Sequence, residues 1–268
     1  MKKLATALVS VAAIMTMSTT AFAAENPAEV FDRVMEKNNT IQSAEIQSGV
    51  HSVILAKDVI PDGQMKVDMA MHAEMDMQDT TDLKYLAQVA SSILGQDSYS
   101  QVFYTDGYYY VDSNGVKLKY PMPLEQIISS VQTGVNTSNM ESSYMKGISL
   151  NEVNGKRVLA YEANPKKLNK NVKEALGTVM NTLGTDVNLD MNIQEMKGAY
   201  VLDDNDYIIY MTNYIVYNME VLDQPMTCIT LMETEVQNPG EPVVVTLPST
   251  DGYEDLIGLY DGVIESEV

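Results

Sequence analysis

Apolar and polar residues alternate along the stretch from Met65 to Met77. Every even position except Ala70 is polar or charged, and the odd positions are Met65, Val67, Met69, Met71, Ala73, Met75 and Met77. A period of two is typical of a β-strand with one covered face and one wet face. We therefore expect the methionines to face inward together, with Lys66, Asp68, His72, Glu74 and Asp76 facing outward. At about 3.3 Å per residue the strand spans roughly 43 Å, so its covered face needs a large partner.

Several further stretches have the composition of strands. A long strand at about 43–58 leads through Pro61-Asp62-Gly63 into the methionine strand, which predicts an antiparallel hairpin. Asp106-Gly107 and Asn114-Gly115 separate short apolar runs and predict a three-stranded meander. The other expected strands are 146–152, 157–163, 187–194, 207–221, 226–237 and 243–247.

Four stretches favour helices. Asn26-Pro27-Ala28-Glu29 is typical of a capped helix start, and the spacing in Asp82–Leu94 predicts a helix that ends at Gly95. Leu124–Val131 favours a short helix. The clearest helix is Leu168–Leu183, whose apolar face is formed by Leu168, Val172, Ala175, Leu176, Val179, Met180 and Leu183. The chain is thus predicted to be α+β: a long, strongly curved antiparallel sheet (a half-barrel) with three to four helices covering its concave face.

The N-terminus has the features of a signal peptide. Lys2 and Lys3 precede an apolar run, and Ala21-Phe22-Ala23 is a small-x-small cleavage site. We expect a signal peptide at 1–23 cleaved near Ala23, a single domain at 24–250 and an acidic tail at 251–268. The protein is expected to be secreted or extracytoplasmic and not membrane-spanning. No cysteine directly follows the apolar run, so no lipid anchor is expected at the new N-terminus.

The charge balance argues against two classes of partner. The chain has 37 acidic and 17 basic residues, for a net charge of −20, and loses two lysines with the signal peptide. Nucleic acid and anionic membrane surfaces would repel such a protein. Cys228 is the single cysteine, so no internal disulfide is possible, and its alternating strand predicts a buried small side chain.

The order of these elements resembles the LolA/LprG-like superfamily of envelope lipoprotein and lipid carriers. The resemblance rests on the signal peptide, the capped first helix, the two long strands, the tyrosine-rich segment 103–110 and the closing hairpin, and it covers most of residues 26–248. The chain looks most similar to uncharacterised secreted members from Gram-positive bacteria. The resemblance implies a half-barrel that holds an acyl chain or a lipidated peptide, and it assigns no individual binding residue.

The methionine-rich strand allows three interpretations. Methionine is unbranched and polarisable, so it fills irregular cores, lines adaptable binding surfaces and ligates soft Cu(I). Met69, Met71 or Met75 would be the copper ligands, although no metal or other cofactor is predicted. The candidate ligand-lining residues are Met65, Val67, Met69, Met71, Met75, Met77, Leu176, Val179 and Met180.

Other candidate chemistry is weak. If the turn pairs residues whose numbers sum to about 123, His51 and His72 lie opposite each other on the wet face, as surface residues or as a weak metal or pH-sensing site. Asp203–Asp206 lacks the glycine and distant glutamate of a calcium loop, which favours a hairpin turn. No nucleophile elbow, phosphate loop or Ser/Cys–His pair is found, so no enzyme is predicted.

The leading interpretation is a non-enzymatic secreted envelope protein that binds a hydrophobic or amphiphilic ligand, such as a lipid, an acyl chain or a lipopeptide, in the concavity of its sheet. The alternative is a non-enzymatic structural or protein-interaction module with a fully packed core. A contiguous apolar cavity would favour the first, and a closed core the second. The sequence names neither the ligand nor an envelope protein partner.

Overall fold

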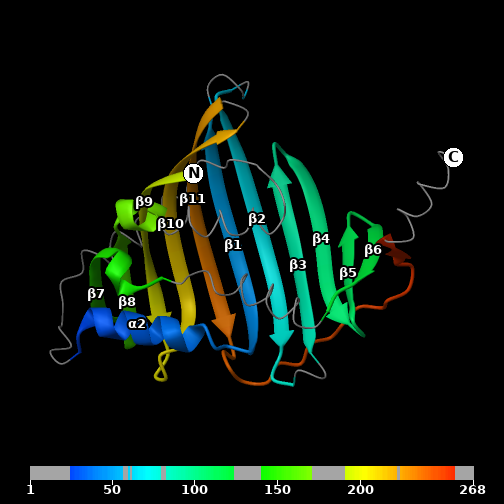
Figure 1. Ribbon diagram of the computed structural model, residues 1–268, viewed down its shortest axis with the longest axis horizontal. Helices are drawn as coiled ribbons and strands as arrows, with labels where there is room; N and C mark the ends of the chain where they lie inside the picture. The colour runs from blue at the N-terminus through cyan, green and yellow to red at the C-terminus, as the bar shows by residue number, and fades with distance from the viewer. Residues whose placement is uncertain are drawn as a thin grey trace. The chain divides into compact units, whose positions relative to one another are not determined.

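The protein is represented by a computed structural model that describes residues 25–56, 60, 62–79, 83–123, 140–170, 191–221 and 224–256 (Figure 1). Within these residues the strands join in one sheet in the order β12-β6-β5-β4-β3-β2-β1-β11-β10-β9-β8-β7. They are β1 (Ser43–Leu55), β2 (Gln64–Asp76), β3 (Lys84–Ile93), β4 (Gln96–Thr105), β5 (Tyr108–Ser113), β6 (Val116–Pro121), β7 (Met145–Val153), β8 (Lys156–Ala163), β9 (Met191–Leu202), β10 (Ile208–Val221), β11 (Gln224–Gln237) and β12 (Glu254–Asp255).

The pairings are mainly antiparallel. β3 to β6 and β7 to β10 pair antiparallel with their neighbours, whereas β12 pairs with β6 in parallel. The predicted large sheet is therefore confirmed, with one short parallel pairing at its edge. The half-barrel curvature stays a prediction.

Within the described residues the prediction of three to four helices is wrong, since only one of the four expected helices, at Pro27–Asn38, is present in full. The described residues contain α2 (Pro27–Asn38), the short 3-10 helix η1 (Ser142–Tyr144) and a helical segment at 165–170. The segment predicted as a helix at Asp82–Leu94 is strand β3. Its neighbouring residues Leu86 and Ala87 point to opposite faces and are both buried, so a strand covered on both sides imitates helical spacing. The helix expected at Leu124–Val131 lies outside the described residues.

The chain divides into two compact units, and each is treated separately below. Unit 1 comprises Met1–Lys37, Gly49–Asp68 and Asn139–Thr234. Unit 2 comprises Asn38–Ser48, Met69–Ser138 and Glu235–Val268. Strands β1, β2 and β11 contribute residues to both units. The division into signal peptide, domain and acidic tail stays a prediction.

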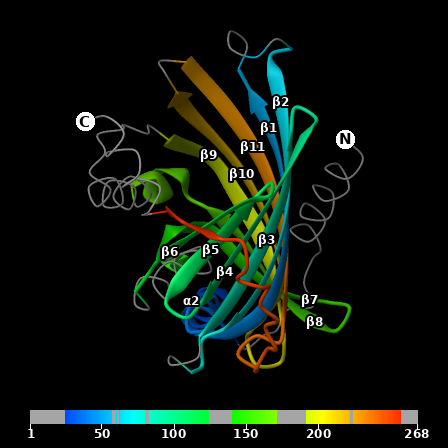
Figure 2. The ribbon, with the colours of Figure 1, turned by 90° about the vertical axis from the view of Figure 1, so that its right-hand side faces the viewer.

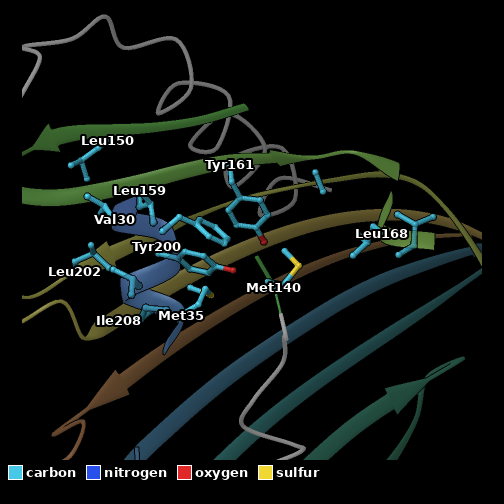
Figure 3. Close-up of a cluster of buried hydrophobic side chains, with 14 residues drawn as sticks. Val30, Met35, Met140, Leu150, Leu159, Tyr161, Leu168, Tyr200, Leu202 and Ile208 are labelled. Atoms are coloured by element: carbon cyan, nitrogen blue, oxygen red, sulfur yellow. The ribbon is translucent and has the colours of Figure 1, made fainter. Parts of the chain in front are cut away.

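The core of unit 1 forms where α2 packs on β7 to β10 (Figure 3). The Asn26 side chain accepts a hydrogen bond from the Ala28 N–H at 3.1 Å and donates one to Glu29 at 3.1 Å, so the helix starts as its sequence predicts. The apolar face of the helix consists of Val30, Phe31, Val34 and Met35, all buried. Phe31 meets the Tyr161 ring edge-on at 5.8 Å between centroids.

A buried polar contact within this core leaves no room for a side chain at position 198. The Tyr161 hydroxyl donates a hydrogen bond to Asn213 Oδ1, and burial raises the pKa of the Tyr161 phenol well above its usual value. Gly198 lies opposite both residues in the ladders. A Cβ atom on Gly198 would lie 2.5 Å from Asn213 Oδ1, 2.5 Å from the Thr212 carbonyl oxygen and 2.9 Å from the Tyr161 hydroxyl. The contact between Tyr161 and Asn213 therefore requires glycine at this position.

We expect Gly198→Ala to lower the free energy of unfolding by about 1–3 kcal/mol, because the added methyl group overpacks this contact. The measurement is urea-induced unfolding followed by circular dichroism. Gly49→Ala is the matched control, since a Cβ there meets nothing within 4 Å. Equal stability of the two variants would contradict this account of the core.

Candidate functional site

The predicted ligand-lining residues of β2 lie on one face of that strand. The part of this face within unit 2, from Met69 to Met77, is called the methionine face below. Met75 and Met77 are buried, Met65, Val67 and Met71 are half-buried, and Met69 is 39% exposed. The face is thus closed at the C-terminal end of the strand and partly open at its middle. Leu176, Val179 and Met180 lie outside the described residues, so the lining role of the whole set stays a prediction.

The pairing of β1 with β2 separates the two histidines. The Met77 N–H donates to the Gln42 carbonyl at 2.7 Å and the Ala56 N–H donates to the Gly63 carbonyl at 3.0 Å, so paired residue numbers sum to 119 (42 + 77 and 56 + 63). The predicted sum of about 123 was therefore wrong. His51 Nδ1 contacts Asp68 at 2.6 Å, and His72 Nε2 contacts Glu45 at 3.1 Å. Each histidine has a carboxylate neighbour, and the two do not form a pair.

The C-terminal segment covers the opposite face of unit 2. Ser43 stands across from Asp76 in the register above, so its side chain points away from the methionine face, and its hydroxyl accepts a hydrogen bond from the Val243 N–H at 3.1 Å. Figure 2 shows the segment, in red, running alongside β3 to β6. The residues that pack together on this side are Leu86, Phe103, Tyr108, Tyr110, Val243, Val245, Leu247 and Tyr253. Tyr253 lies edge-on to the stacked rings of Phe103 and Tyr110, at 5.6 and 5.1 Å.

Because side chains alternate along each strand, the neighbours of Leu86, Phe103 and Tyr110 point toward the methionine face. They form three rows across β3, β4, β5 and β6. The tyrosine row is Tyr85, Tyr104, Tyr109 and Tyr120. The middle row is Ala87, Val102, Val111 and Leu118, and the outer row is Val89, Ser100, Ser113 and Val116.

The two inner rows extend the apolar surface of unit 2 well beyond β2. Ala87 and Tyr104 are buried, and the other six members of these rows are half-buried. Sequence reasoning missed these residues as a site, although the alternation of the meander strands contained the signal. Because Asp82–Leu94 was predicted to be a helix, β3 was not predicted as a strand of the sheet. The meander β4 to β6 was therefore not expected to continue through β3 toward β2.

The central strands of unit 1 carry hydroxyl and sulfur groups that contact one another. The hydroxyls of Ser52 and Thr230 lie 2.9 Å apart, and Cys228 Sγ lies 3.7 Å from Met219 Sδ. Burial raises the pKa of the Cys228 thiol, while a hydrogen bond with Tyr217 lowers it by less. Cys228 is free and buried, as predicted.

The acidic turn at Asp203–Asp206 serves the fold of unit 1. Asp203 Oδ1 accepts hydrogen bonds from the N–H groups of Asn205 and Tyr207 at 2.9 and 2.8 Å. Asp206 accepts hydrogen bonds from Arg33 of α2, at 2.8 Å, and from Arg157 of β8. Across the described chain, no group of three or more His, Cys, Asp or Glu side chains is placed to hold a metal ion.

A comparison with known protein families finds a match over most of the chain. The model of the "Family of unknown function (DUF6612)" matches residues 26–248. The chain belongs to this family. A search of curated proteins finds no match for this DUF6612 chain. No described helix combines the length and hydrophobicity that crossing a membrane requires.

Two solved structures resemble the DUF6612 chain weakly. LprF from Mycobacterium bovis superposes with a TM-score of 0.36 at 9% identity, over 83% of this chain and 97% of LprF. A "Beta-barrel-like Protein of Domain of Unknown Function DUF1849" from Brucella abortus superposes with a TM-score of 0.25 at 10% identity, over 74% of this chain and all of that one. Neither superposition is close enough to indicate a function, so the resemblance to the LolA/LprG-like superfamily stays a prediction.

The salt bridges of Asp206 should make stability depend on pH. Burial raises the pKa of Asp206, but hydrogen bonds from Arg33 and Arg157 outweigh it and hold the pKa below 3.8. A carboxylate with a depressed pKa contributes stability above its unfolded pKa, and this contribution is lost as the pH falls through the folded value. Asp206→Asn should therefore lower the free energy of unfolding by about 1 kcal/mol near neutral pH and by less at about pH 2. Urea unfolding at both pH values, with Asp204→Asn as the control in the same turn, measures this. A deficit of equal size at both pH values would contradict the assignment.

The covering segment of unit 2 provides a second prediction. Val245 is buried against Phe103 and its neighbours, whereas the adjacent Val244 is 88% exposed. Val245→Asp should lower the free energy of unfolding by about 2–4 kcal/mol, because an unpaired carboxylate replaces a packed side chain. Val244→Asp should change it by less than about 0.5 kcal/mol. Equal thermal unfolding of the two variants would show that the segment does not cover this face.

Proposed function

We propose that this protein is a non-enzymatic binder of a hydrophobic or amphiphilic ligand, and that the ligand lies on the methionine face of unit 2. The observation that carries the proposal is Met69, which is 39% exposed in the middle of a long strand whose other face is charged. An apolar side chain in such a position gains free energy when a ligand removes it from water.

The surroundings of Met69 support this assignment. Half-buried Met71 follows on the same face, and the middle row of β3 to β6 provides further aliphatic surface within the same unit. Methionine adapts to ligands of varied shape because it is unbranched and polarisable. Surfaces that bind apolar ligands combine such side chains with few polar groups.

We also propose that the protein acts outside the cytoplasm. The features of a signal peptide before Ala24 support a protein that acts outside the cytoplasm, in the cell envelope or beyond it. The family resemblance supports a carrier or a sensor of envelope lipids, with a lipid, an acyl chain or a lipopeptide as the ligand.

The test is a fluorescence titration with N-phenylnaphthylamine, an uncharged probe that brightens in apolar sites. The protein is purified without the signal peptide and stripped of co-purified lipid by organic extraction, and mass spectrometry identifies what the extract contains. We expect saturable binding by the wild type. Met69→Glu should weaken it by about tenfold or more, because a carboxylate placed against an apolar ligand must be desolvated.

Ala70→Glu is the matched control, since Ala70 is exposed on the opposite face of the same strand. It should bind the probe as the wild type does, and both variants should unfold at the wild-type temperature. Absence of saturable binding by the stripped wild type would overturn the proposal and leave the protein-interaction module. Equal loss of binding in both variants would show that the ligand does not bind at the methionine face.

A further inference from the structure

The methionine face of unit 2 has no charged side chain on any described residue of its strands from β1 to β6. The residues of these strands that point to this face are aliphatic, methionine, tyrosine, serine or glutamine. The charged residues are on the other face, where Lys117 and Lys119 lie over the rings of Tyr253 and Tyr108 at 5.3 and 5.2 Å. A ligand on the methionine face therefore meets no cation within these strands.

The charge nearest to this face by register is negative. The edge strand β12 pairs Glu254 with Leu118 of the middle row, and neighbouring residues in a ladder point to the same side. The protein as a whole has a net charge of −20. Both the local and the global field disfavour an anionic head group.

The tyrosine row supplies one set of polar groups on this face. Its four rings stand in register on adjacent strands, and the rings of Tyr109 and Tyr120 lie 5.5 Å apart. The Tyr104 hydroxyl donates to the Met122 carbonyl at 3.3 Å. Among the described residues, the hydroxyls of Tyr85, Tyr109 and Tyr120 have no hydrogen-bond partner, and the three side chains are half-buried.

The surroundings of these hydroxyls oppose negative charge. Burial raises the pKa of Tyr85, and burial together with the phenols of Tyr85 and Tyr120 raises the pKa of Tyr109 strongly. An environment that disfavours a phenolate also disfavours a carboxylate or a phosphate. A neutral oxygen of a hydroxyl, ester or ether group accepts the same hydrogen bonds without this cost.

We propose that the ligand of this face is an uncharged amphiphile whose head group bears hydroxyl or carbonyl oxygens, and that Tyr85, Tyr109 and Tyr120 hydrogen-bond that head group. The inference rests on the proposed function and goes further, because it assigns a class of head group and an orientation. The head group lies at the tyrosine row, and the apolar chain runs over the middle row toward Met71 and Met69.

The experiment compares ligands with the same chain length by displacement of bound N-phenylnaphthylamine at about pH 8. Monopalmitoylglycerol provides the uncharged hydroxyl head group, palmitate the anion, hexadecyltrimethylammonium the cation and hexadecane the bare chain. We expect monopalmitoylglycerol to bind at least about tenfold more tightly than palmitate, because an unpaired anion costs more than one neutral hydrogen bond provides. Tighter binding of palmitate or of the cation would overturn the assignment of an uncharged ligand while the proposed function stands.

The role of the tyrosine row is tested by Tyr109→Phe and Tyr120→Phe. Each should weaken the binding of monopalmitoylglycerol by about three- to tenfold and leave the binding of hexadecane unchanged, because only the neutral hydrogen bond is removed. Tyr108→Phe is the matched control, since Tyr108 packs on the opposite face of the same strand as Tyr109. Unchanged monopalmitoylglycerol affinity in both variants, or an equal loss in Tyr108→Phe, would overturn the role of the row. Loss of probe binding by the wild type would instead defeat the proposed function itself.

Discussion

The constant register between β1 and β2 is the constraint on which the rest of the structure depends. Backbone hydrogen bonds at the two ends of this pair, from Met77 to Gln42 and from Ala56 to Gly63, share one register. Because side chains alternate, a slip of one residue would move every methionine of β2 to the charged side. The same register turns the Ser43 hydroxyl toward the C-terminal segment, and so decides which face that segment covers.

The C-terminal segment covers one face of unit 2. Val243, Val245 and Tyr253 close the side that bears Leu86, Phe103 and Tyr110, and these contacts require no part of the methionine face. Within β1 to β6 the chemistry of the two faces differs: charges and cation–π contacts lie on one, and aliphatic, thioether and hydroxyl groups lie on the other. This difference makes the uncharged face suited to a mainly apolar ligand with few polar atoms.

The core of unit 1 is packed differently. There α2 buries Phe31 against Tyr161, and the contact of Tyr161 with Asn213 requires the absence of a side chain at Gly198. A polar contact buried so tightly specifies one arrangement of helix and sheet. The described core of unit 1 is therefore packed by its own helix, whereas the binding surface proposed for unit 2 includes exposed Met69 and several half-buried residues.

Local patterns in the sequence determined the elements whose signals are local. The cap at Asn26, the apolar face of α2, the alternation of β2 and the Asp-Gly and Asn-Gly turns all depend on residues a few positions apart, and the structure has them where the sequence predicts. Tertiary contacts decided the rest. Leu86 and Ala87 in β3 read as helical because both faces of that strand are buried, one by a segment more than 150 residues away in the sequence. The register of β1 and β2, and with it the separation of His51 from His72, follows from pairing along the whole hairpin, which turn residues alone do not specify. The tyrosine row exists only because four strands align, and no spacing within one strand contains that alignment.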